Sequence, residues 1–308
     1  GEGSIPACQA LIYSGILFAA FVFLYLAGIR GAWLLLGTLG AGFHPLVLLN
    51  VWRIHDGNPT VLLVLGFLAC GLWYMKSKNG WSIVAWGAIT GLMLVARVNT
   101  ILLILPAMFL LRKKTILFLA STALVFMAVN MAIKQTPFFF PSHGYYNLFS
   151  GANEYSAEYL LKDFSGENSH ADALRARGYG DMETFEARLN FPPETYKKLA
   201  IEYIKNNPLE YAKLGAIKAV TLFRPGYHGQ GFSIIKIILA LPFFVWLFFV
   251  WKTKREFFAK ENLFVFLVAA LYLLPFIVAN ADPRYRFPMD IVFILDSVRR
   301  WLRCRRAS

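Results

Sequence analysis

The 308-residue chain is 57% hydrophobic and only 16% charged, which excludes an ordinary soluble globular domain. Its formal net charge is +13. The basic residues stand in short clusters between long apolar stretches, and no basic face with interleaved aromatic residues occurs outside those stretches. The charge therefore indicates a membrane orientation signal, and we expect no nucleic-acid partner.

Long apolar stretches follow one another along the chain. A spanning helix needs about 20 mostly apolar residues, because every backbone polar group must be hydrogen-bonded within the bilayer. Six stretches meet this requirement: residues 10–28, 32–51, 59–75, 115–133, 232–251 and 263–280. We further predict two helices meeting near Arg97 within residues 81–111, and a short tilted or interfacial helix over residues 287–298. The sequence thus predicts an all-α polytopic membrane protein with about nine membrane helices.

Basic clusters at alternate turns predict the orientation of these helices, since cytoplasmic loops carry an excess of Lys and Arg. The clusters are Lys76 with Lys78, Arg112 to Lys114, Lys252 to Lys260, and Arg299 to Arg306. We predict N-terminal membrane helices over residues 1–134, an extracytoplasmic segment over 135–230, and C-terminal membrane helices with a basic cytoplasmic tail over 231–308. The predicted location is the inner membrane of a bacterium.

The predicted outer segment is polar, because residues 137–210 hold eleven of the 18 acidic residues. An amphipathic pattern begins at Pro193 and stops at Asn206-Asn207-Pro208. A second helix is predicted from Pro208 to Phe223, and its basic residues Lys213 and Lys218 suit a helix at a membrane surface. We expect the segment to be a lid or acceptor platform and not an independent domain.

Polar residues beside the predicted spans are the candidates for chemistry. Asp56 with Arg53 could act as a general base or bind phosphate, or could cap a helix while Arg53 reaches the membrane edge. Arg97 either faces a cavity within the membrane or lies in a turn between two short helices. Arg284 and Arg286, braced by two prolines, make a rigid turn able to hold a phosphate.

The segment from His143 to Asn153 contains residues that could contact a sugar. Its glycines and asparagines permit tight turns, and Tyr145 could stack on a sugar ring, although an ordinary loop has the same composition. Elsewhere, the spacing of Gly87 and Gly91 predicts close helix packing, as does the glycine-rich stretch 37–42.

Taken in order, these features resemble the GT-C glycosyltransferases, in particular bacterial protein mannosyltransferases and lipid A aminoarabinose transferases. The resemblance rests on Cys8 to Leu11, His44-Pro45, Trp86 to Arg97, Asn147 to Asn153, Tyr196 to Pro208, Lys218 to Pro225 and Asp282 to Pro288. Members of the family begin with a further membrane helix and an acidic outer loop, which the 308 residues lack. We expect either a fragment or a divergent or inactive member.

The resemblance implies transfer of a sugar from a polyprenyl-phosphate donor to a glycan, lipid or protein acceptor on the outer face of the membrane. It makes Asp56 the candidate catalytic carboxylate. The implied donor phosphate-binding residues are Arg284, Arg286, Arg53 and Arg97, and those for the sugar or acceptor are His143, Tyr145, Asn147 and Asn153. No cofactor is certain, and a divalent metal is left open.

Two other classes of protein remain. The first is a transporter or flippase for a lipid-linked sugar, which should carry ionisable groups within the membrane and internal symmetry. The second is a non-catalytic, truncated homologue.

Overall fold

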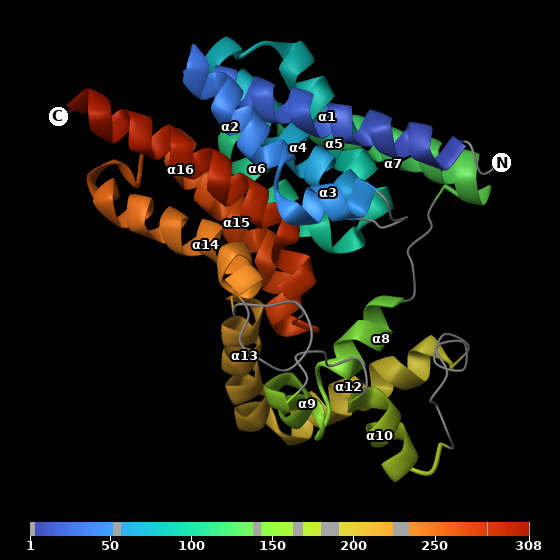
Figure 1. Ribbon diagram of the computed structural model, residues 1–308. Coiled ribbons are helices and arrows are strands. Elements are labelled where there is room, and N and C mark those ends of the chain that lie inside the picture. Colours follow the sequence, from blue (N-terminus) through green and yellow to red (C-terminus); the bar gives the residue numbers. More distant parts are fainter. Residues whose placement is uncertain are drawn as a thin grey trace. The chain divides into compact units, whose positions relative to one another are not determined.

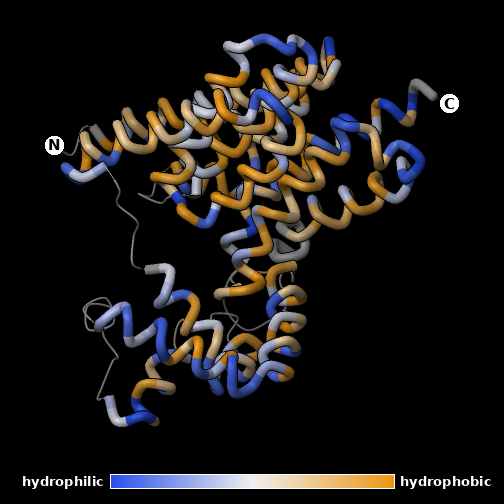
Figure 2. Tube along the Cα trace, turned by 180° about the vertical axis from the view of Figure 1, so that it is seen from behind, coloured by the Kyte–Doolittle hydropathy of each residue, from blue (hydrophilic) through white to orange (hydrophobic). Residues whose placement is uncertain are grey.

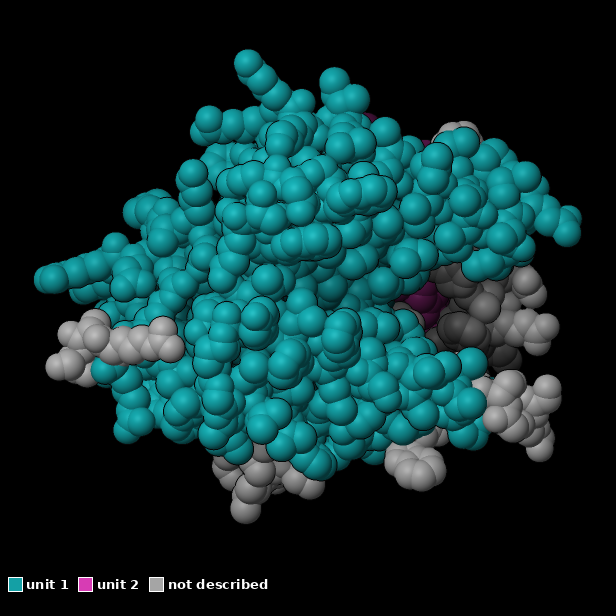
Figure 3. Space-filling model, turned by 90° about the horizontal axis from the view of Figure 1, so that it is seen from above, with its two compact units in different colours: residues 1–140, 241–272, 287–308 teal, residues 141–240, 273–286 magenta. Residues whose placement is uncertain are grey.

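The computed structural model describes residues 4–51, 57–137, 143–162, 169–179, 191–223, 234–281 and 283–307 (Figure 1). All regular secondary structure in these ranges is helical. The chain divides into two compact units (Figure 3). Unit 1 comprises residues 1–140, 241–272 and 287–308, and unit 2 comprises residues 141–240 and 273–286.

Unit 1 contains most of the apolar helices, which are orange in Figure 2. Its helices are α1 (Ser4–Leu26), α2 (Ala32–Gly42), α3 (Pro45–Val51), α4 (Gly57–Ser77), α5 (Gly80–Ala96), η1 (Val98–Leu103), α6 (Ile104–Leu111), η2 (Arg112–Lys114), α7 (Thr115–Lys134), η3 (Lys254–Glu256) and α16 (Phe287–Ala307). The boundary between the units falls within α14 (Ile234–Lys252) and α15 (Lys260–Val278).

Four segments are long and apolar enough to cross a membrane: Ile5–Leu26, Gly57–Ser77, Val98–Lys134 and Lys260–Val278. A fifth is formed if α2 and α3 count as one bent span. Large apolar side chains on α1 and α7 remain exposed, among them Leu11, Phe18, Ile116 and Leu124, at 69–79% of their full surface. Exposed apolar faces of this kind indicate lipid contact. The protein is therefore an α-helical membrane protein, while the nine predicted helices are not confirmed.

The predicted single span over residues 32–51 is wrong in one respect, because α2 and α3 are bent by 57° at a short break. Pro45 begins α3, where its missing N–H costs nothing, and it disfavours helical backbone at the preceding His44. The predicted break near Arg97 is confirmed, since Arg97 has extended backbone (φ −150°, ψ 104°) between α5 and η1. The predicted helix over residues 287–298 is longer than expected and extends to Ala307.

The predicted close packing at glycines is also confirmed. A Cβ on Gly87 would lie 2.6 Å from the Phe118 carbonyl oxygen, and one on Gly91 would lie 2.7 Å from the Thr122 carbonyl oxygen. The contact between α5 and α7 is therefore backbone to backbone. The Ser121 hydroxyl adds a hydrogen bond of 2.8 Å to the Val84 carbonyl across the same interface.

Unit 2 contains α8 (His143–Ser150), α9 (Ser156–Lys162), α10 (Ser169–Ala176), α12 (Pro193–Asn206), α13 (Pro208–Phe223) and η4 (Pro283–Arg286). The predicted helices beginning at Pro193 and at Pro208 are confirmed, with the expected ends. A small buried core joins α8, α10 and α12 through Phe149, Ala152, Ala173, Leu174, Phe191, Tyr196, Leu199 and Ala200. The polar segment therefore has an apolar core of its own.

Candidate functional site

Several predicted site residues lie outside the part of the chain that the structure describes. Arg53 and Asp56 belong to residues 52–56, and the side chains of His143 and Arg284 are likewise outside the description. Their roles stay predictions. Arg97 is half-buried at the break between α5 and η1, and its carbonyl oxygen accepts a hydrogen bond of 2.7 Å from the Thr100 hydroxyl.

Arg286, a predicted phosphate ligand, is fully buried in unit 2. Its guanidinium Nη1 donates to the carbonyl oxygen of Leu222 at 2.9 Å. Leu222 lies in the last turn of α13, where carbonyl groups have no partner within the helix. A cation at this position satisfies such a carbonyl and complements the negative end of the helix dipole. Arg286 thus ties η4 to the end of α13.

Lys218 makes an equivalent contact with another helix end. Its ammonium Nζ donates to the carbonyl oxygen of Val278, the last residue of α15, at 2.8 Å. The Tyr211 hydroxyl donates to the same oxygen at 2.6 Å, and the Tyr211 ring lies 5.0 Å from Nζ. Tyr211 and Lys218 thus bind the end of α15 from one helix.

The prediction that Lys218 lies on a basic, exposed face of α13 is wrong, because the side chain is fully buried. Leu214, Lys218, Thr221 and Leu222 are the buried positions of α13, and their spacing is that of one helix face. Lys218 therefore points inward with the apolar residues. Lys213, by contrast, is exposed and pairs with Glu210 at 2.7 Å.

Burial lowers the pKa of Lys218 from 10.5 to about 7, because the charged ammonium loses its hydration. Within the described part of the chain, no carboxylate comes within ion-pair distance of this ammonium. An ammonium has three N–H donors, and the Val278 carbonyl uses one of them. Lys218 can therefore donate to an additional acceptor.

The turn after α8 approaches the same region of unit 2. A Cβ on Gly151 would lie 1.5 Å from the Ala279 carbonyl oxygen and 3.0 Å from Lys218 Nζ. Only glycine allows this approach. The adjacent Asn280 is 2% exposed, and its side-chain oxygen Oδ1 has no hydrogen-bond partner among the described residues. The structure thus brings together Gly151, Lys218 and the end of α15.

The predicted sugar-contacting residues in this turn differ in their surroundings. Asn153 is fully buried; its amide nitrogen donates to the Phe149 carbonyl at 2.7 Å, and its oxygen accepts from the Tyr155 backbone N–H at 3.0 Å. These bonds give Asn153 a structural role in the turn. Tyr145 and Asn147 are half-buried on α8, and their contact with a sugar stays a prediction.

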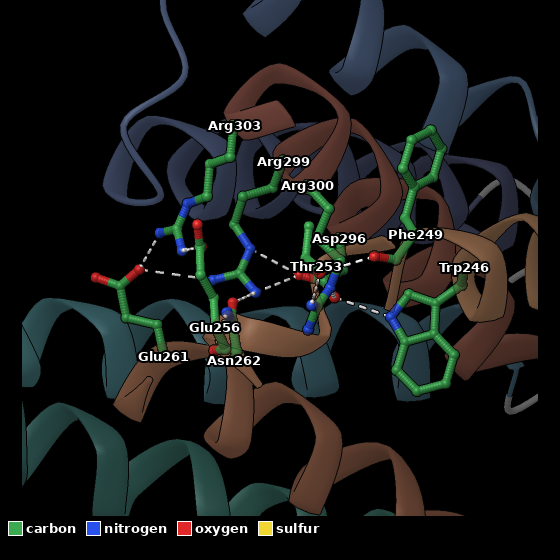
Figure 4. Close-up of polar contacts among 10 residues, drawn as sticks. All are labelled: Trp246, Phe249, Thr253, Glu256, Glu261, Asn262, Asp296, Arg299, Arg300 and Arg303. Atoms are coloured by element: carbon green, nitrogen blue, oxygen red, sulfur yellow. Dashed lines mark hydrogen bonds and ion pairs between the residues drawn. The ribbon is translucent and has the colours of Figure 1, made fainter. Parts of the chain in front are cut away.

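A second polar cluster, within unit 1, was missed by the sequence analysis (Figure 4). Asp296 is fully buried on α16 and accepts from Arg299 Nε and Arg300 Nε, both at 2.7 Å, and from Trp246 Nε1 at 2.8 Å. Arg300 also donates to the Thr253 hydroxyl at 2.7 Å. The spacing of Asp296, Arg299 and Arg300 on one helix was a signal that could have revealed the cluster.

Further contacts extend this cluster to the start of α15. Arg299 donates to the Asn262 side-chain oxygen at 2.7 Å, and Arg303 pairs with Glu261 at 2.5 Å. The sequence analysis placed Arg299 and Arg300 in a basic cytoplasmic tail. The structure instead buries both arginines, because each bonds to Asp296, and Arg299 also reaches α15 while Arg300 reaches Thr253 in the turn after α14.

Among the described residues, no group of three or more His, Cys, Asp or Glu side chains is placed to hold a metal ion. The divalent metal left open by the resemblance stays a prediction. The chain matches no protein-family model, no curated protein and no solved structure. The functional argument therefore rests on the residues themselves.

Proposed function

We propose that the chain is an integral membrane glycosyltransferase that transfers a sugar from a polyprenyl-phosphate donor to an acceptor on the outer face of a bacterial inner membrane. The observation that carries the proposal is Lys218, which is fully buried in unit 2 with its Nζ 3.0 Å from where a Cβ on Gly151 would lie. A buried ammonium without a carboxylate partner is costly, and a bound phosphate would compensate the charge of Lys218 and favour its protonated form.

The electrostatics of unit 2 suit a phosphate leaving group. When the bond between the sugar C1 and the phosphate oxygen breaks, negative charge develops on that phosphate. Cations in a water-poor environment stabilise this charge more strongly than exposed cations would. Arg286 offers a planar guanidinium, and Lys218 offers a compact ammonium with donors remaining after its bond to the Val278 carbonyl.

The other parts of the proposed reaction follow from the sequence. The attacking acceptor hydroxyl must lose its proton to a base, for which Asp56 is the candidate carboxylate. Arg284, Arg53 and Arg97 are candidates for additional phosphate contacts. Tyr145 is a candidate for sugar stacking, on the half-buried surface of α8. The acceptor is a glycan, a lipid or a protein.

The donor-binding part of the proposal can be tested without knowing the sugar. The full chain is purified in detergent micelles, and its affinity for a polyprenyl monophosphate is measured by microscale thermophoresis. Lys218→Met removes the charge and keeps a long unbranched side chain, and Arg286→Lys keeps the charge but loses the planar fork. We expect Lys218→Met to weaken binding at least tenfold, and Arg286→Lys to weaken it less.

Arg177 provides the matched control in unit 2, because its guanidinium pairs with Glu154 at 2.6 Å and has no part in the proposed site. The Arg177→Lys variant should bind the polyprenyl monophosphate like the natural chain. Unchanged affinity in Lys218→Met, with folding verified by circular dichroism, would refute the phosphate site. Transfer itself is tested with a complete lipid-linked sugar pool and an acceptor extract, in which Asp56→Asn should abolish turnover.

A further inference from the structure

Three turns that are far apart in the sequence meet at one end of unit 1. Lys78 lies between α4 and α5, Lys114 lies directly before α7, and Lys260 begins α15. The Lys114 ammonium donates to the Lys78 carbonyl oxygen at 2.9 Å. The buried ring of Tyr74 lies 4.7 Å from Lys78 Nζ and 5.9 Å from Lys114 Nζ. The Lys114 side chain is therefore held next to the turn that carries Lys78.

The three ammonium groups repel one another. Partial burial, followed by the positive charges of Lys260 and Lys114, lowers the pKa of Lys78 below its ordinary value of 10.5. In the described ranges, no carboxylate pairs with Lys78, Lys114 or Lys260. The nearby acidic residue in the sequence, Glu261, is bonded to Arg303 at 2.5 Å. Within the described ranges, the fold thus holds three like charges together without a carboxylate at ion-pair distance.

Helix dipoles add to this positive charge. The turns carrying the three lysines immediately precede or open α5, α7 and α15, so the N-terminal ends of three long helices lie in these turns. Each N-terminus carries a partial positive charge, although at α5 the Asn79 side chain already accepts from the Ser82 N–H and at α7 the Thr115 N–H donates to the Arg112 carbonyl. A phosphate is the kind of anion that such positions accept.

Each lysine has a large, exposed apolar neighbour a few residues away. Trp81 is 77% exposed near Lys78, Ile116 is 79% exposed near Lys114, and Phe258 is 81% exposed near Lys260. In water such side chains would be costly, whereas at a bilayer interface they contact lipid. A free phosphate would leave them uncovered. A lipid with an anionic headgroup satisfies both the charges and the apolar side chains.

We propose that Lys78, Lys114 and Lys260 bind the phosphate headgroup of an anionic phospholipid. The exposed side chains of Trp81, Ile116 and Phe258 contact the glycerol and upper acyl region of the same lipid layer. This site differs from the proposed donor site, which lies among residues of unit 2. Its ligand is a structural lipid of the bilayer and is not consumed.

The test compares phosphatidylglycerol with phosphatidylcholine of the same acyl chains. The full chain in non-ionic detergent is titrated with each lipid, and bound lipid is counted by native mass spectrometry. In the triple variant Lys78→Ala, Lys114→Ala, Lys260→Ala, we expect the affinity for phosphatidylglycerol to fall by about fivefold per lysine, hence on the order of a hundredfold. The affinity for phosphatidylcholine should stay unchanged.

Two further variants separate the site from general effects. The triple Lys→Arg variant keeps all three charges and should retain the preference for phosphatidylglycerol. It therefore tests the role of the charges even if the alanine variant does not fold. Lys213→Ala removes an exposed lysine that is already paired with Glu210, and it should bind both lipids normally. The proposal is overturned if the alanine variant keeps the preference, or if inorganic phosphate alone binds the natural chain as tightly as phosphatidylglycerol does.

Discussion

Replacement of Lys218 by methionine should abolish a pH dependence in the stability of unit 2. Burial lowers the pKa of Lys218 to about 7 in the folded chain, whereas an unfolded chain restores its ordinary value of 10.5. Between these two values the unfolded state binds one more proton than the folded state. Stability must therefore rise with pH across this window, and the penalty of burying the charge is fully present below pH 7.

The size of the effect follows from the two pKa values. Each pH unit inside the window changes the free energy of unfolding by about 1.4 kcal/mol for one proton. Lys218 is partly protonated in the folded state near pH 7.5 and partly deprotonated in the unfolded state near pH 9.5, so the change is slightly less than two full units give. The Lys218 contribution should make the free energy of unfolding about 2.5 kcal/mol larger at pH 9.5 than at pH 7.5. Measurements stay below pH 10, because burial raises the pKa of Tyr211 above 10.0 and titration of tyrosine would oppose the trend.

The assay is urea unfolding of the full chain in non-ionic micelles, followed by circular dichroism at the two pH values. Lys218→Met should lose the rise in stability, while Tyr211 continues to donate to the Val278 carbonyl. Lys213→Met is the matched control, because Lys213 is exposed on the same helix and should leave the pH dependence intact. The reasoning is refuted if Lys218→Met and the natural chain show the same change between pH 7.5 and 9.5.

Three substitutions test the other close contacts. Gly91→Ala should lower the stability of the membrane helices in an SDS titration by about 1–3 kcal/mol, because the added Cβ would clash with the α7 backbone and push α5 and α7 apart. Gly80→Ala, with open space at its Cβ, should be neutral, and equal losses would contradict the packing argument. Asp296→Asn should cost about 3–5 kcal/mol in the same titration, since two buried arginines lose their carboxylate, and a variant of unchanged stability would disprove this role. Gly151→Ala should weaken polyprenyl monophosphate binding at least tenfold, whereas Gly144→Ala, which meets nothing within 4 Å, should bind normally.

Local patterns in the sequence were enough to predict many of the helices and some of their contacts. The break at Arg97 and the helix starts at Pro193 and Pro208 depend on neighbouring residues, and the structure confirms them. The packing of Gly87 and Gly91 follows from their spacing of one helical turn, which leaves a groove for a second backbone. The contact between Lys114 and the Lys78 carbonyl shows that two of the basic turns lie together, while the side of the membrane that they face stays a prediction.

The sequence analysis failed where a charged side chain has a distant partner. It assigned Lys218 to an exposed basic face, although this residue has the same helical spacing as the buried Leu214 and Leu222. It counted Arg299 and Arg300 only as orientation signals. A charged residue on an apolar face can be buried or can reach water, and its own neighbours do not decide between the two.

The sequence by itself therefore determined that this is an α-helical membrane protein with one polar segment, because apolar length and charge distribution are local properties. Only the tertiary structure decided which cations are buried and what compensates them. Lys218 bonds to a carbonyl 60 residues away, and Arg286 bonds to one 64 residues away. The cost of burying a charge depends on these long-range partners, so the candidate site became visible only when the chain was folded.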